Sequence, residues 1–104
     1  MKFFLVISTV PTLKAARKIA VELLKKKLAA CIMISALSES HYVWKGKKET
    51  AREHMLLIKT QASRYRKLEA AIRQIHSYKN PEIIAVPIQK GSRDYLGWIR
   101  DSMC

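Results

Sequence analysis

The chain is poor in the residues from which most catalytic and metal sites are built. It has two cysteines and three histidines among 104 residues, and no CxxC, HxxH or HExxH motif, which argues against a structural zinc site within one chain. It also has neither a Gly-rich phosphate loop nor a nucleophile elbow. Glu49 and Glu53 share one face of a predicted strand but lie about 13 Å apart, too far for paired-carboxylate chemistry. The sequence therefore predicts a protein that is not an enzyme and needs no cofactor to fold.

Long apolar runs, linkers and repeats are absent as well. No run approaches the roughly 20 apolar residues that span a bilayer, and three glycines and three prolines leave no low-complexity tract. Cys31 lies in an apolar stretch and Cys104 is the last residue, a pattern typical of a reduced intracellular chain. We predict one domain, residues 1–104, in the cytoplasm and without a membrane partner.

Acidic residues are scarce: eight Asp and Glu stand against 20 Lys and Arg, for a net charge of +12. Such a balance suits nucleic acids, anionic membranes or acidic small molecules. Along the chain, however, the basic residues are spread over every segment, which favours a generally basic solvated surface. Nucleic-acid binding is therefore only an alternative.

Apolar periodicity predicts the order β-α-β-β-α-β followed by a short helix. Thr12 and Ser92 are expected to cap the first and last helices, and Pro87, which lacks a backbone donor, indicates an edge strand or a bulge. In the last helix we expect Tyr95, Leu96, Trp98 and Ile99 to pack inward. This order is the ferredoxin-like α+β fold, in which the first and third strands are central. The predicted strands cover residues 2–9, 28–44, 47–60 and 81–88, and the predicted helices 12–27, 62–77 and 92–101.

One RNA-binding module shares this order of elements but stacks bases on aromatic residues of its third strand. The corresponding segment here, "AREHMLLIKT", has no aromatic residue. The sequence therefore argues against that module.

The predicted hairpin is too long for a compact monomer. Residues 28–60 turn at Lys45-Gly46, so each extended arm would reach about 50 Å. Its far half carries Tyr42, Val43 and Trp44, and an uncovered edge of this length favours association. We therefore predict that further copies of the chain cover it.

Several short segments together resemble the CutA divalent-cation tolerance proteins. They are "KLAAC", "YVWKG", "EHMLLIKT", "HSY" with "PEIIAVP", and "DYLGW", spread from about Leu5 to Trp98. The resemblance implies a ferredoxin-like protomer, a homotrimer with long hairpins that wrap neighbouring subunits, and a role in tolerance of copper and other divalent metals. It further implies copper(II) or another divalent cation as a ligand.

The resemblance also indicates site residues. It places Trp44, Glu53, Lys59, Tyr78 and Glu82 near intersubunit clefts, either as a polar cluster that sets trimer register or as a ligand cleft. His76 is the metal candidate. Copper favours thiolate, thioether and imidazole donors, yet "LVISTV" offers only Ser8 and Thr9, and Ile75 adjoins His76. Other ligands would have to come from elsewhere or from another subunit.

The sequence thus predicts a non-enzymatic, homotrimeric protein of divalent-metal tolerance. One alternative is a sensor of small anions or nucleotides similar to the PII signalling proteins, and another is a non-specific nucleic-acid binder.

Overall fold

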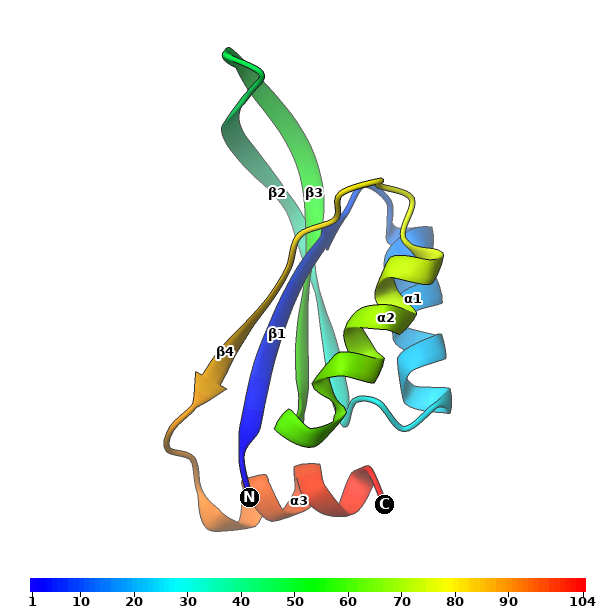
Figure 1. Ribbon diagram of the computed structural model, residues 1–104, viewed down its shortest axis with the longest axis vertical. Helices are drawn as coiled ribbons and strands as arrows, with labels where there is room; N and C mark the ends of the chain where they lie inside the picture. The colour runs from blue at the N-terminus through cyan, green and yellow to red at the C-terminus, as the bar shows by residue number, and fades with distance from the viewer.

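A computed structural model describes residues 1–104 as a four-stranded antiparallel sheet with two helices on one face and a third at its end (Figure 1). The predicted order of elements is confirmed. The strands are β1 (Phe3–Val10), β2 (Cys31–Trp44), β3 (Lys47–Gln61) and β4 (Ile83–Ile88). The helices are α1 (Leu13–Lys25), α2 (Tyr65–Ile75) and α3 (Arg93–Ser102), and the 3-10 turn η1 (Ala62–Arg64) precedes α2.

The sheet order is β2-β3-β1-β4, so β1 and β3 are central as predicted. Pro87 lies in β4 opposite Phe4 and has no strand on its other side. Edge strands tolerate a residue without a backbone N–H, and the prediction of an edge strand is confirmed.

The core lies between the sheet and the layer formed by α1 and α2. The side chain of Thr12 caps α1 by accepting a hydrogen bond from the Ala15 N–H at 3.1 Å. Apolar residues at helical spacing then face the sheet and are buried against its strands. They are Ala16, Ile19 and Leu23 of α1 and Leu68, Ala71 and Ile72 of α2, which pack with Val6, Val10, Leu56 and Ile58.

The β2–β3 hairpin extends beyond the rest of the molecule, at the top of Figure 1. Its turn is Lys45-Gly46, as predicted, with φ of 51° and 79°. A bulge that the sequence did not reveal lies between Ile34 and Leu37. There the Ser35 hydroxyl accepts a hydrogen bond from the Met55 N–H at 2.7 Å, which satisfies a backbone group that the irregular ladder would leave unpaired.

The helices cover only one face of the sheet, and the other face, which we call the open face, is apolar. Directly paired residues share a face, so Ile84, Ile7, Leu57 and Met33 form a row across all four strands. Met33 and Ile84 are exposed, whereas Ile7 and Leu57 are half-buried. Antiparallel sheets that face water normally carry polar residues there, so this face has the character of an interface.

Helix α3 lies across the end of the sheet and corrects one expectation. Ile99 is buried with Met103 and Phe3, and Leu96 packs at its margin, but Tyr95 and Trp98 are exposed. Because the helix meets only one end of the sheet, it buries a narrow stripe rather than all four predicted residues.

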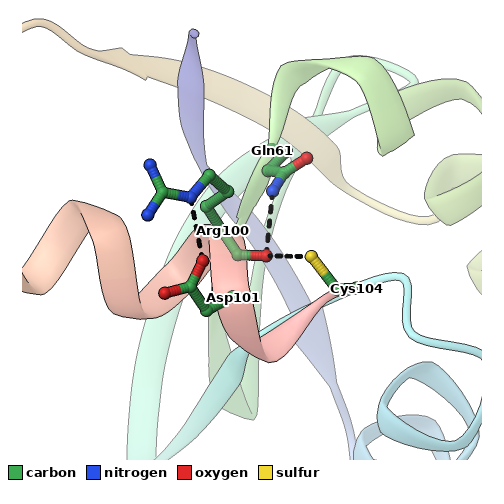
Figure 2. A network of polar contacts seen from close by, with 4 residues as sticks. All are labelled: Gln61, Arg100, Asp101 and Cys104. Carbon is green, nitrogen blue, oxygen red and sulfur yellow. Dashed lines mark hydrogen bonds and ion pairs between the residues drawn. The ribbon is translucent and has the colours of Figure 1, made fainter.

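Polar contacts hold the C-terminal end of α3 in place. Figure 2 shows the side chain of Gln61, at the end of β3, donating to the carbonyl oxygen of Arg100 at 3.3 Å. The same oxygen accepts a contact from the Cys104 Sγ at 3.5 Å, and the Arg100 guanidinium pairs with Asp101 at 2.9 Å.

None of the helices is long and apolar enough to cross a membrane.

Candidate intersubunit groove

A groove of about 830 Å³ lies where the hairpin leaves the sheet and meets the loop between α2 and β4. Four of the five residues predicted for a cleft line it: Trp44, Glu53, Tyr78 and Glu82. We call it the hairpin groove. Its other lining residues come from the end of β1, the hairpin and the loop, and they are Thr9, Ser40, His41, Tyr42, Ala51, Ser77, Lys79 and Asn80.

Glu53 is the buried acidic residue of this groove. Side chains alternate along a strand, so Glu53 projects on the same side of β3 as Leu57, toward the open face. It is 9% exposed, and its carboxyl oxygen accepts a hydrogen bond from the Ser40 hydroxyl at 3.2 Å. No Lys or Arg of the chain pairs with it. A buried carboxyl group without a cation is costly, so the groove is electrostatically incomplete in a single chain.

Tyr78 faces Glu53 from the α2–β4 loop. Burial, the largest cause, and the hydrogen bond with the negatively charged Glu53 carboxylate together raise the pKa of the Tyr78 phenol to about 12. The phenol therefore stays protonated at neutral pH and is available as a donor to the acidic residue. Tyr78 also packs on the His76 ring, with centroids 5.0 Å apart.

His76 sits at the C-terminal end of α2, with both ring nitrogens engaged by backbone groups. Its Nε2 lies 2.7 Å from the Thr9 carbonyl oxygen, and its Nδ1 accepts from the Tyr78 N–H at 3.0 Å. A carbonyl can only accept, so this pattern assigns the ring hydrogen to Nε2. The ring therefore joins the α2–β4 loop to the end of β1, and a metal ion could bind only by displacing one of these bonds.

Lys59 does not line the groove of its own chain. It lies six residues beyond Glu53 along β3, or about 20 Å. There its ammonium group donates to the Tyr95 hydroxyl at 2.8 Å and lies 5.0 Å from the centre of that ring. The hydrogen bond with Tyr95 raises the pKa of Lys59. The single chain therefore does not bring Lys59 together with the other four predicted cleft residues.

Trp44 lies at the outer end of the groove, next to the hairpin turn, and is exposed. Ser40, His41 and Tyr42 also line the groove but were not predicted as site residues. The hairpin register could have indicated Ser40, because it places Ser38 opposite Glu53 and Ser40 two residues along on the same face.

Metal-binding side chains do not converge within the chain. No group of three or more His, Cys, Asp or Glu side chains is close enough to hold an ion. In the groove, the His41 ring pairs with Glu39 at 2.9 Å rather than with Glu53 or Glu82.

Comparison with known proteins identifies relatives over nearly the whole chain. The sequence model of the CutA1 divalent ion tolerance protein family matches residues 4–102. The divalent-cation tolerance protein CutA of Thermus thermophilus is 40% identical over 93% of this chain and 94% of its own length.

Solved structures agree with this result. CutA from Xylella fastidiosa superposes with a TM-score of 0.95 at 36% identity, covering 100% of both chains. CutA from Archaeoglobus fulgidus gives a TM-score of 0.92 at 37% identity over 99% of both chains, and that protein is described as periplasmic. The cytoplasmic location predicted for the present chain is therefore not a property common to all its relatives. The fold, the matched segments and these relatives together establish that the chain belongs to the CutA1 divalent ion tolerance protein family.

Proposed function

We propose that this chain acts in tolerance of divalent cations as a non-enzymatic homotrimer in the cytoplasm. The role in metal tolerance is supported by family membership and by the names of the relatives, which are those of tolerance proteins rather than enzymes.

The observation that carries the assembly is the apolar open face. Burial of apolar surface is worth about 25 cal/mol per Å², and here the row through Ile84, Ile7, Leu57 and Met33 has no cover in the single chain. The hairpin adds Val43, which is 68% exposed. Further copies of the chain are the proposed cover for both surfaces, and the family resemblance sets their number at three.

A neighbouring copy would also complete the hairpin groove. Glu53 lacks a cation, whereas Lys59, Tyr95 and Trp98 are presented at the other end of the molecule. We propose that Lys59 of one subunit approaches Glu53 and Tyr78 of the next. All five predicted cleft residues would then belong to one intersubunit site, although no single chain brings them together.

Divalent cations would bind, on this proposal, through side chains of more than one subunit. Within a subunit, Glu53 and Glu82 are the carboxylates of the groove, and carboxylates suit hard divalent ions. His76 would contribute to a copper or zinc site only if it gave up its bond to Thr9 or Tyr78.

The alternative of a small-anion sensor finds less support. Two glutamates line the groove against Lys79 and His41, so it does not present the basic surface that an anion or nucleotide needs.

Sedimentation equilibrium at micromolar concentration tests the assembly, and the expected mass is three times 12.0 kDa. A folded lone subunit would refute it. Thermal unfolding of the assembled protein with copper(II) or zinc tests binding, and we expect a rise in Tm. Loss of that rise in Glu82→Gln would assign it to the groove carboxylates, and loss in His76→Ala to the imidazole. No heat on calorimetric titration of the metal-free trimer would contradict metal binding and leave the assembly standing.

A further inference from the structure

The layer formed by α1 and α2 carries half of the basic residues of the protein and two thirds of its net charge. We define the helix layer as residues 13–27 and 62–75. It holds ten of the 20 Lys and Arg residues and two of the eight acidic residues, and therefore +8 of the net +12. The sequence suggested an even spread, because these residues lie in two segments far apart in the chain. Folding brings both segments to one side of the sheet (Figure 1).

Most of these charges have no partner within the chain. The only ion pair in the layer joins Lys26 to Glu22 at 3.3 Å, and the other glutamate, Glu69, accepts from the Tyr65 hydroxyl. Exposed cations without carboxylate partners include Lys14, Arg17, Lys18 and Lys25 on α1 and Arg66, Lys67 and Arg73 on α2. Like charges held close together repel one another, so this face is complementary to an extended anionic surface.

Aliphatic side chains stand among these cations. Val21 is 65% exposed and Leu24 is 49% exposed. Residues three, four and seven apart share a helix face, so Val21 lies in line with Lys14, Arg17 and Lys25. Exposed aliphatic groups flanked by lysines match a lipid headgroup region, where the ammonium groups meet phosphates and the aliphatic groups reach the acyl boundary.

Nucleic acid fits the layer less well. Single-stranded recognition uses exposed aromatic rings for stacking, but the aromatic residue of this layer, Tyr65, is half-buried and packs edge-on against Phe4. A phosphate backbone would make no favourable contact with the aliphatic side chains of Val21 and Leu24. The mixture of cations and aliphatic groups therefore favours a lipid surface over a nucleic acid.

The layer also offers a recess for a headgroup. Between the end of α1 and α2 lies an open depression of about 330 Å³. Lys26, Lys67 and Gln74 contribute polar groups to it, and Leu28, Ala70 and Ala71 form its apolar wall. The two lysines of this recess suit a lipid phosphate, whereas the two carboxylates of the hairpin groove would repel one.

We propose that the helix layer docks on the surface of an anionic lipid bilayer, without crossing it. Subunit association through the open face would leave the layer accessible, because the two surfaces lie on opposite sides of the sheet. Several helix layers in one assembly would bind the same bilayer at once, which would increase the overall affinity. The sequence-based expectation was that the protein has no membrane partner; the proposal departs from it only in surface docking, since no helix is long and apolar enough to cross a membrane.

Co-sedimentation with vesicles tests it. The protein is mixed with vesicles of phosphatidylcholine containing about one third phosphatidylserine, and in parallel with pure phosphatidylcholine. We expect binding only to the anionic vesicles, with a strong decrease as salt rises. Equal binding to both kinds of vesicle, or none to either, would overturn the proposal.

Two triple variants with the same change in charge locate the site. Lys18→Gln/Lys25→Gln/Lys67→Gln removes three cations of the helix layer, and we expect binding to weaken about tenfold or more. The control, Lys45→Gln/Lys47→Gln/Lys48→Gln, removes three exposed lysines at the hairpin turn, and we expect less than about a threefold effect. Equal losses would mean that net charge alone drives binding, which would refute docking by this layer.

A third variant separates lipid from nucleic acid. Val21→Ser/Leu24→Ser keeps the charge and alters only exposed positions, so the fold should persist. We expect it to weaken vesicle binding about threefold or more, since each buried methylene contributes to partitioning. Unchanged vesicle binding in this variant, or binding to a DNA duplex stronger than to vesicles, would overturn the lipid proposal in favour of a polyanion that recognises charge only.

Discussion

Two buried hydroxyl groups in the same sheet should respond to mutation in opposite directions. Ser8 in β1 and Thr60 in β3 are both completely buried. The Thr60 hydroxyl donates to the Leu28 carbonyl oxygen at 2.7 Å, whereas the Ser8 hydroxyl has no hydrogen-bond partner. Ser8 lies opposite Leu56 and Ile83, whose side chains offer its hydroxyl group no hydrogen-bond partner. Burying this group without a partner is a cost that the fold bears in its native state.

Ser8→Ala should therefore stabilise the protein, by about 1 kcal/mol. An unpaired buried hydroxyl costs about 1–3 kcal/mol, and the small void left by one oxygen atom offsets part of that gain. Thr60→Val removes a satisfied hydroxyl at similar volume and leaves the Leu28 carbonyl without its donor, so it should destabilise by about 1–2 kcal/mol. The two variants thus compare the stability effect of removing a buried hydroxyl group that has a hydrogen-bond partner with that of removing one that has none.

Urea unfolding at one fixed protein concentration measures both variants, since the proposed assembly would make stability depend on concentration. The shift in the midpoint at unchanged slope gives the change in the free energy of unfolding. If Ser8→Ala destabilises the protein as much as Thr60→Val does, a partner for the Ser8 hydroxyl exists and the reasoning is wrong.

Three further predictions concern pH, a helix end and the loop. The raised pKa of Tyr78 favours the neutral phenol in the folded state, so the contribution of this group to stability should be complete below pH 10 and lost as pH rises toward about 12. Urea unfolding across this range should show a smaller loss of stability in Tyr78→Phe than in the unmodified protein. An identical loss in both would contradict the assignment. Lys27, two residues beyond the last residue of α1, has a φ of 55°, so Lys27→Gly should stabilise by about 0.5–1 kcal/mol in thermal unfolding; Lys27→Ala, which loses the side chain but keeps the left-handed backbone, should give no gain. His76→Ala breaks bonds to Thr9 and Tyr78 and should cost about 1–3 kcal/mol; an unchanged urea midpoint would show that the ring does not hold the loop.

Local signals predicted the elements well, because the interactions that form them lie within a few residues. The Thr12 and Ser92 caps each bond a backbone N–H three residues on, and the Lys45-Gly46 turn determines the register that pairs His54 with Leu37. The bulge near Ser35 was missed because its decisive hydrogen bond reaches 20 residues along the chain, to Met55.

The candidate site was predicted less completely. Family resemblance indicated its residues, and the fold brings Trp44, Glu53, Tyr78 and Glu82 into one groove. Lys59 lies outside this groove because a strand is extended, and the six residues from Glu53 to Lys59 span about 20 Å. No pattern in the sequence alone shows which of these side chains share a groove.

The sequence by itself determined the order of the elements, the capping residues, the hairpin turn and the family, since these depend on periodicity, on local hydrogen bonds and on matched segments. Only the tertiary structure decided that one face of the sheet is apolar and uncovered, that Glu53 is buried without a cation, and that half of the basic residues share the helix layer. These features depend on contacts between segments far apart in the chain. Interactions between charges and between apolar surfaces depend on the distances between side chains in space, and the amino-acid sequence does not give those distances.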